Sequence, residues 1–376
     1  MSVDERLARL ALSRLAEPGA LTMARMVAEL GAPRLYAELR AGREDRGHPE
    51  VAARLAAIEP ERDLERAARL GIRWVVPGDA EWPTPLDDLE AAEPLHRMGR
   101  APLGLWVRGP LRLDRLPAPV AVVGSRSATT YGTDVAAELS AGLARAGSTV
   151  VSGAAFGIDQ AAHRGALAGG GPTVAVLACG VDRAYPAAHQ RLLDHLAEHA
   201  AVVSELAPGC APTRLRFLAR NRVIAALGRG TVVVEAAVRS GALNTASWSM
   251  SLNRPVMGVP GPVTSAPSEG VHQLIRSGAA TLVERTEHVL ELTGQMGDHL
   301  VEAVRAPTRP RDLLSHRQQR VLEAVPLVHP AASDSVARTA GLGPPEVRSE
   351  LDELLRRGLV EQLPTGWRLA EAAGQG

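Results

Sequence analysis

Short apolar runs rich in β-branched residues recur through the middle of the chain, and segments with helical periodicity separate them. The runs lie at residues 120–124, 148–153, 173–180, 201–206, 231–236, 255–261 and 280–283. They are apolar on both faces, whereas residues 134–147 alternate polar and apolar side chains at helical spacing. Strands that are buried on both faces and alternate with amphipathic helices are typical of a parallel sheet with helices on both sides. The pattern predicts an α/β fold with an extended Rossmann-like, doubly wound and mostly parallel sheet.

The N-terminal third of the chain follows another pattern. Residues 1–70 place apolar side chains at helical spacing between Gly and Pro, which predicts an N-terminal all-α domain. The second predicted helix and the turn at residues 31–33 resemble part of a SAM or helix–hairpin–helix unit, although a purely structural helical domain is the simpler interpretation. Short strands among prolines at residues 71–118 are expected to extend the main sheet, so the Rossmann-like domain is predicted to span residues 71–292.

The C-terminal part of the chain shows a linker followed by a small helical pattern. Residues 293–312 contain Pro and Arg and are predicted to form a linker. Residues 313–371 contain three short helical patterns and then a hairpin pattern, which predicts a winged-helix-like domain. Winged helices bind DNA in some proteins and other proteins elsewhere. Because the third helical pattern mixes Arg with acidic residues, a transcription regulator that binds duplex DNA is the less favoured interpretation.

The charge balance restricts where an anion could bind. The chain has 42 basic and 42 acidic residues, so its formal net charge is zero and any anion site must be local. Every one of the 42 basic residues is arginine. Arginine presents a planar guanidinium that binds phosphate through paired hydrogen bonds.

The cysteines and the apolar segments indicate in which cellular compartment the protein is expected. Cys179 and Cys210 are too few for a disulfide framework and lack metal-ligand spacing, so no metal site is expected. The sequence has no apolar run of the ~20 residues that cross a bilayer, and its first ten residues lack a signal-peptide core. We therefore expect a cytoplasmic protein that does not associate with a membrane.

The loops after the first two predicted strands are candidates for binding an anion. In a doubly wound sheet, ligands bind in the crevice at the carboxyl ends of the strands. Small residues in these loops would let the backbone approach a phosphate at the start of the next helix. The candidates are Gly124, Ser125, Arg126, Ser152, Gly153, Phe156 and Gly157. The dinucleotide and P-loop fingerprints are absent, which disfavours a classical NAD site or an ATPase, and no cofactor is expected.

Two later segments place positive charge at the same edge of the sheet. Residues 214–222 hold five Arg or Asn residues at the expected start of a helix. Positive charge there opposes the helix dipole and destabilises the helix by up to ~1 kcal/mol. That cost favours an anion site over a solvated helix face. The loop after the fifth strand carries Arg-Ser-Gly at another helix start. The candidates in both segments are Arg220, Asn221, Arg222, Arg239, Ser240, Gly241 and Thr245.

Two further features concern catalysis and base binding. Asp159 and His163 lie one helical turn apart, but no Ser or Cys nucleophile accompanies them, so no catalytic residue is predicted. Whether Asp159 caps its helix or contacts a ligand stays open. Four aromatic residues are expected beside the carboxyl-edge loops, where bases could stack on them for ~1–3 kcal/mol each. They are Tyr131, Phe156, Tyr185 and Phe217. This combination favours a groove for a single strand over a closed pocket.

Five motifs in this chain resemble, in order, those of the DNA processing protein A family, DprA or Smf, of bacterial natural transformation. They are Val-Gly-Ser-Arg at 123–126, Ser-Gly-x-x-x-Gly-Ile-Asp-x-x-Ala-His at 152–163, Arg-Asn-Arg-x-Ile at 220–224, Arg-Ser-Gly-x-x-x-Thr-Ala at 239–246, and Pro-Gly-x-x-Thr-Ser-x-x-Ser-x-Gly-x-x-x-Leu-Ile at 260–275. The resemblance covers roughly residues 71–292. It depends on no single motif.

The resemblance implies a protein that is not an enzyme. It implies binding of single-stranded DNA, protection of incoming strands, loading of the RecA recombinase, and a homodimer formed through the Rossmann-like domain. By motif position, the implied DNA contacts are Ser125, Arg126, Arg220, Asn221, Arg222, Arg239, Ser240 and Gly241. Phe156 departs from the family pattern because an Arg is common there, and the change exchanges a charge for a ring.

An enzyme that processes nucleotides is the alternative. Similar Rossmann-like folds occur in phosphoribohydrolases that cleave nucleoside monophosphates. Their Pro-Gly-Gly-x-Gly-Thr-x-x-Glu signature is missing at residues 235–245, where this chain lacks the paired glycines. A DNA-binding protein is therefore the favoured interpretation.

Overall fold

The computed structural model describes residues 3–41, 49–295, 297–299 and 310–370. The chain divides into two compact units, Met1–Val301 and Glu302–Gly376, and each is described by itself. Among the described residues, no helix combines the length and apolar character that a bilayer span requires.

One sheet of nine strands organises the first unit within the described residues. The strands are β1 (Ile72–Val75), β2 (Leu105–Arg108), β3 (Val120–Val123), β4 (Val150–Ser152), β5 (Thr173–Val176), β6 (Ala201–Ser204), β7 (Thr231–Val233), β8 (Val256–Gly258) and β9 (Thr281–Leu282). Their order across the sheet is β1-β2-β6-β5-β4-β3-β7-β8-β9. All seven strands predicted from apolar runs are present, and all seven are parallel.

The direction of winding reverses at β3. From β3 the chain moves outward through β4, β5 and β6, then returns to the other side of β3 as β7, β8 and β9. The reversal between β3 and β7 is the topological switch point of a doubly wound sheet, where ligands bind beyond the carboxyl ends of the strands. The Rossmann-like prediction is confirmed. The 71–118 segment extends the sheet as expected, because β2 pairs antiparallel with the outer edge of β6 and β1 pairs antiparallel with β2.

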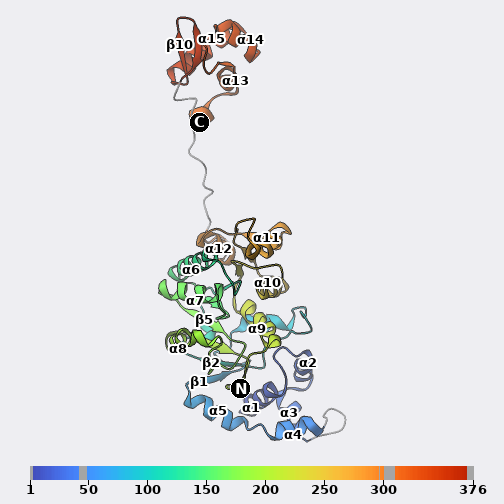
Figure 1. Ribbon diagram of the computed structural model, residues 1–376. Helices are drawn as coiled ribbons and strands as arrows, with labels where there is room; N and C mark the ends of the chain where they lie inside the picture. The colour runs from blue at the N-terminus through green and yellow to red at the C-terminus, as the bar shows by residue number, and fades with distance from the viewer. Residues whose placement is uncertain (1–2, 42–48, 296, 300–309, 371–376) are drawn as a thin grey trace. The chain divides into compact units, whose positions relative to one another are not determined.

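Helices cover both faces of the sheet, which explains why the central strands are apolar on both sides. Val120 and Val122 face one layer of helices, and Ala121 and Val123 face the other. The first layer contains α6 (Thr130–Arg145), α7 (Ile158–Ala168), α8 (Gln190–His199) and α12 (Thr286–Thr293). The second contains α9 (Arg214–Leu227), α10 (Gly241–Ser251) and α11 (Glu269–Arg276). Figure 1 shows these layers on opposite sides of the sheet.

The N-terminal residues are helical, as predicted, and they belong to the same compact unit as the sheet. The helices are α1 (Val3–Leu15), α2 (Leu21–Leu30), α3 (Ala32–Arg40), α4 (Pro49–Ala56) and α5 (Pro60–Arg69). Leu12, Leu35 and Leu55 form a core of their own. Leu10 of α1 instead joins the apolar cluster beneath β1 and β2, which attaches the helices to the sheet.

The second unit contains three helices followed by a hairpin, in the predicted order. Its elements are η5 (Pro310–Leu313), α13 (His316–Ala324), α14 (Ser333–Ala340), α15 (Pro344–Arg356), β10 (Val360–Leu363) and β11 (Gly366–Leu369). A capping box between Ser315 and Gln318 begins α13, and the backbone of Ala331 pairs with Trp367 on the hairpin. The winged-helix assignment stays a prediction. Residue 296 and residues 300–309 of the predicted linker lie outside the described residues.

Candidate nucleic-acid interface

A cleft of about 820 Å³ lies at the switch point of the sheet. Its walls are the loop after β3, the first turns of α9, the loop after β7 and the start of α10. Nine of the fourteen residues predicted from the sequence line it: Gly124, Ser125, Arg126, Arg220, Asn221, Arg239, Ser240, Gly241 and Thr245. Three of the nine are arginines, so the structure gathers the positive charge expected at this edge.

A buried glutamate holds the loop after β3 in place. The backbone N–H of Ser125 donates to the carbonyl of Glu235 over 2.7 Å, and the Glu235 carboxylate accepts from the N–H of Thr129 over 2.9 Å. The Thr129 hydroxyl donates to the same carboxylate over 2.5 Å. Gly124 is required because a Cβ there would lie 2.5 Å from the Ile158 side chain. The loop is therefore fixed from beneath, while Arg126 remains exposed at the cleft.

Aromatic rings line one wall of the cleft beside Arg126. The Arg126 guanidinium lies 4.3 Å from the centroid of the Phe217 ring, a cation–π distance. The rings of Tyr185 and Phe217 are 5.6 Å apart and tilted by 52°. Tyr185 is 45% exposed and lines the cleft, so part of this side chain is open to a ligand there. Two of the four aromatics predicted at this edge thus meet inside the cleft.

Arg220 forms the floor of the cleft and is 7% exposed. Its Nη1 donates to the carbonyl of Val176 over 2.8 Å, and its Nε has no hydrogen-bond partner among the residues that the structure describes. Burial lowers the pKa of Arg220, and the charge of Asp159 acts against that shift. Burial in turn raises the pKa of Asp159, against the positive charge of Arg220. A desolvated guanidinium at the base of a cleft is suited to an incoming anion.

The start of α10 forms the opposite wall. Asn221 donates from Nδ2 to the carbonyl of Gly241 and to Oδ1 of Asn244, each over 3.2 Å, which ties α9 to α10. The Ser240 hydroxyl caps α10 by accepting from the N–H of Ala242 over 3.3 Å. Arg239 is exposed just before this helix start. A helix N-terminus and an adjacent arginine both favour an anion.

Ser152, Gly153 and Gly157 do not line the cleft, although we predicted that they would. The Ser152 hydroxyl is buried and donates to the carbonyl of Val122 over 2.6 Å. Gly153 instead makes room for Arg220, since a Cβ there would lie 1.7 Å from Nη1 of that guanidinium. At Gly157, φ is +75°, and a Cβ would lie 2.3 Å from the Ser125 carbonyl. These residues support the cleft from behind.

Phe156 also lies outside the cleft lining. It is 46% exposed, and its ring meets His189 edge-on, with centroids 4.7 Å apart. The ring is therefore available at the surface but is not part of the wall that Tyr185 and Phe217 form.

Arg222 is placed away from the cleft. It is fully buried, and its Nη2 forms an ion pair with the Glu205 carboxylate. Arg216, in the first turn of the same helix, pairs with Glu17 at 2.7 Å. Carboxylates from other segments therefore neutralise both arginines, so the predicted uncompensated charge is wrong at these two positions. Arg214 and Arg220 of this helix both line the cleft, so they keep the positive charge that was predicted there.

Asp159 and His163 have separate environments. The N–H of Ala155 donates to Asp159 over 3.4 Å, which satisfies a backbone donor at the start of α7, and Asp159 also lines the cleft. His163 is fully buried, and its Nδ1 lies 2.8 Å from the Thr173 hydroxyl. Burial lowers the pKa of His163 to about 3. His163 therefore belongs to the packed core under the sheet.

Three glutamates that shape the cleft were not found by sequence reasoning. Glu235 was seen only as part of a missing enzyme signature, and Glu17 and Glu205 were not singled out. Each contacts a partner on another element, 106 residues away for Glu235 with Thr129, 199 for Glu17 with Arg216 and 17 for Glu205 with Arg222. Within the described residues, no cluster of three or more His, Cys, Asp or Glu side chains could hold a metal ion.

The fold and the cleft define a Rossmann-like α/β protein with an arginine-lined cleft at its switch point. The family model of DNA recombination-mediator protein A matches residues 73–294, and the chain belongs to this family. The chain is 44% identical over 369 residues to the putative DNA processing protein DprA of Mycobacterium tuberculosis, covering 97% of this chain and 94% of that protein. It is 39% identical over 258 residues to protein Smf of Escherichia coli, covering 66% and 67% of the two chains.

Two solved structures share the fold. The X-ray structure of DNA processing protein A from Streptococcus pneumoniae matches with a TM-score of 0.64 and 32% identity, covering 77% of this chain and 97% of that one. The DNA processing protein A of Helicobacter pylori, whose structural description concerns its single-stranded DNA binding mode, matches with a TM-score of 0.51 and 25% identity. That match covers 58% of this chain and 94% of the other.

Proposed function

We propose that this protein binds single-stranded DNA along the switch-point cleft. The observation that carries the proposal is that Arg126, Arg220 and Arg239, from three separate segments, line one cleft beside the Tyr185 and Phe217 rings. Guanidinium groups bind the phosphates of a backbone, and exposed rings accept unstacked bases. The combination matches an unpaired strand, because the bases of a duplex are already stacked on one another.

The relatives support this assignment. The Helicobacter protein with the same fold is described by its binding of single-stranded DNA. We extend that property to this chain because its cleft supplies both kinds of contact that a flexible strand needs. On this proposal the contacts are Gly124, Ser125, Arg126, Arg220, Asn221, Arg239, Ser240, Gly241 and Thr245.

The finer role that we propose is protection of incoming strands and loading of the RecA recombinase on them, by a homodimer formed through the Rossmann-like domain. Family membership is the support for this role. The protein would act without catalysis, since its contribution is to hold the strand. A nuclease-protection assay and a RecA strand-exchange assay test these two steps separately.

The nucleotide-processing alternative has less support. The carboxylate at the position of the missing enzyme signature, Glu235, is buried and accepts both hydrogen bonds from Thr129. It is therefore committed to the loop after β3. Release of a free base from AMP by the purified protein would favour the alternative.

A fluorescence anisotropy titration with a labelled oligodeoxythymidylate tests the proposal. Arg126→Ala should weaken binding and lower the slope of log K against log salt by ~0.7, the value for one phosphate contact on a single strand. Arg164→Ala, which removes an exposed arginine of α7 outside the cleft lining, is the matched control and should leave both quantities unchanged. Equal affinity and slope for the wild type and Arg126→Ala would contradict the proposal.

A further inference from the structure

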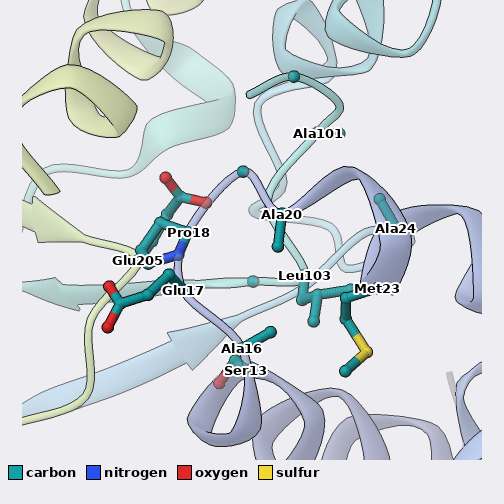
Figure 2. Close-up of a pocket in the computed structure, with 13 residues that line it drawn as sticks. Ser13, Ala16, Glu17, Pro18, Ala20, Met23, Ala24, Ala101, Leu103 and Glu205 are labelled. Atoms are coloured by element: carbon teal, nitrogen blue, oxygen red, sulfur yellow. The ribbon is translucent and has the colours of Figure 1, made fainter. Parts of the chain in front are cut away.

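The turn between α1 and α2, residues 17–19, packs against a side of α9 that faces away from the cleft. Figure 2 shows Glu17 and Pro18 of this α1–α2 turn beside Glu205, which follows β6. The turn and Glu205 line a cavity of about 40 Å³. The other side of α9 presents Phe217 and Asn221 to the cleft. The helix that carries the cleft floor is therefore held between the cleft and the N-terminal helices.

The first contact of the α1–α2 turn with α9 is an ion pair. The Glu17 carboxylate accepts from Nε and Nη2 of Arg216, over 2.8 and 2.7 Å, so both of its oxygens are used. Arg216 also donates from Nη1 to the carbonyl of Ala211 over 2.6 Å. This one side chain therefore joins the turn, the first turn of α9 and the loop that leads into the helix. A bidentate pair fixes direction as well as distance.

The second contact lies further along α9, at Arg222. The Arg222 guanidinium is fully buried between Glu205 and Gly19, and a Cβ on Gly19 would lie 3.0 Å from Arg222 Nε. Gly19 has φ of +76°, which a residue with a side chain rarely adopts. Its carbonyl accepts from the N–H of Gly99 over 3.1 Å, which fixes the turn on its other side.

The third contact lies directly behind the cleft floor. Pro18, Arg216 and Arg220 line a small cavity of about 10 Å³ that Glu205 also borders. Arg220 lines the cleft as well, so this one residue borders both the cavity behind the α1–α2 turn and the cleft.

We infer that the α1–α2 turn is a positioning element for the DNA cleft, with Glu17 as its principal positioning residue. The inference rests on the proposed function and adds a role for the N-terminal helices within it. Glu17 does not touch the strand. It holds the first turns of α9 so that Phe217, Arg220 and Asn221 meet the strand in one fixed arrangement.

Glu17→Gln in the full chain tests this role, because it keeps the size of a partly exposed side chain and removes its charge. Asp63→Asn is the matched control: Asp63 pairs with Arg14 at 2.9 Å, which joins α5 to α1 without touching α9. Hydrogen–deuterium exchange in the absence of DNA should become up to about fivefold faster for amides 216–221 in Glu17→Gln, the range expected for one ion pair. It should be unchanged there in Asp63→Asn.

The same variants are titrated with a labelled oligodeoxythymidylate at several salt concentrations. Glu17→Gln should weaken binding by up to about fivefold with the salt slope unchanged, because no phosphate contact is lost. The double variant Glu17→Arg with Arg216→Glu should recover part of the affinity and of the amide protection. Unchanged exchange in Glu17→Gln would overturn the inference, and so would tighter binding with a steeper slope, which would make Arg216 a masked phosphate contact.

The exchange measurement and the DNA titration together separate this inference from the proposed function. If the wild type binds no single-stranded DNA, the proposed function fails, while the exchange experiment still decides whether the α1–α2 turn holds α9. If the wild type binds and Glu17→Gln matches Asp63→Asn in both measurements, the positioning role fails alone.

Discussion

The guanidinium of Arg126 lies over the ring of Phe217, 4.3 Å from its centroid. This contact joins the loop after β3 to α9, two segments that are far apart in the chain and that form neighbouring walls of the cleft. An arginine held on a ring keeps its outward N–H groups free for phosphate. The contact therefore places a phosphate-binding group and a base-stacking surface at one point of the cleft.

Phe217→Ala should weaken binding of single-stranded DNA by ~1–3 kcal/mol, the range for loss of one stacking ring. The salt slope should stay near the wild-type value because no charge is removed. Anisotropy titrations of Phe217→Ala, Arg126→Ala and the double variant measure the coupling between the two residues. Strict additivity of the two losses would show that the contact between them contributes nothing to binding.

Gly153→Ala should displace Arg220 from the cleft floor. The new Cβ would lie 1.7 Å from Nη1 of Arg220, which is closer than any contact permits. We expect a loss of DNA affinity comparable to that of Arg220→Ala, together with destabilisation of about 1–3 kcal/mol from overpacking. Urea unfolding measures the second effect. Gly241→Ala, whose Cβ would meet nothing within 4 Å, is the stability control. If Gly153→Ala binds DNA with wild-type affinity, Arg220 does not belong to the binding site.

Arg239→Ala should act through charge alone. Arg239 is exposed at the cleft beside the start of α10. Its removal should leave the unfolding midpoint unchanged and lower the salt slope by ~0.7. Arg276→Ala, which removes an exposed arginine at the end of α11, should leave the slope unchanged. Equal salt slopes for the two variants would mean that Arg239 does not contact a phosphate of the bound strand.

His163 should make the protein less stable in acid. Burial lowers its pKa to about 3 in the folded state, against an ordinary value of 6.5. On acidification the unfolded chain takes up this proton at a higher pH than the folded protein does. The contribution of His163 to the free energy of unfolding is therefore complete above about pH 6.5 and is lost as the pH falls toward 3, at up to about 1.4 kcal/mol per pH unit. Urea unfolding of wild type and His163→Gln across this range measures the difference, and parallel pH profiles would contradict it.

The sheet could be predicted from the sequence because each central strand buries both faces and so carries an unbroken apolar run. The same runs end at the loops that line the cleft, which is why Arg126, Arg220 and Arg239 were all placed at one edge. The arrangement follows from topology: parallel strands carry their carboxyl-end loops to the same side of the sheet.

The supporting contacts could not be predicted in the same way. Small residues after β4 were interpreted as room for a ligand, whereas Gly153 provides room for Arg220 and Gly157 for the Ser125 carbonyl. Arg222 looked like an anion contact because its partner Glu205 lies on another element. Periodicity reports which residues are buried, but it does not report which buried charge meets which carboxylate.

The most direct test of the central claim is a competition between unlabelled single-stranded and duplex oligonucleotides of equal length for the purified full chain bound to a labelled single strand. The cleft offers rings for unstacked bases and arginines for one backbone, so the single strand should displace the label at a much lower concentration than the duplex. Equal displacement by both, or preferential displacement by the duplex, would contradict the account.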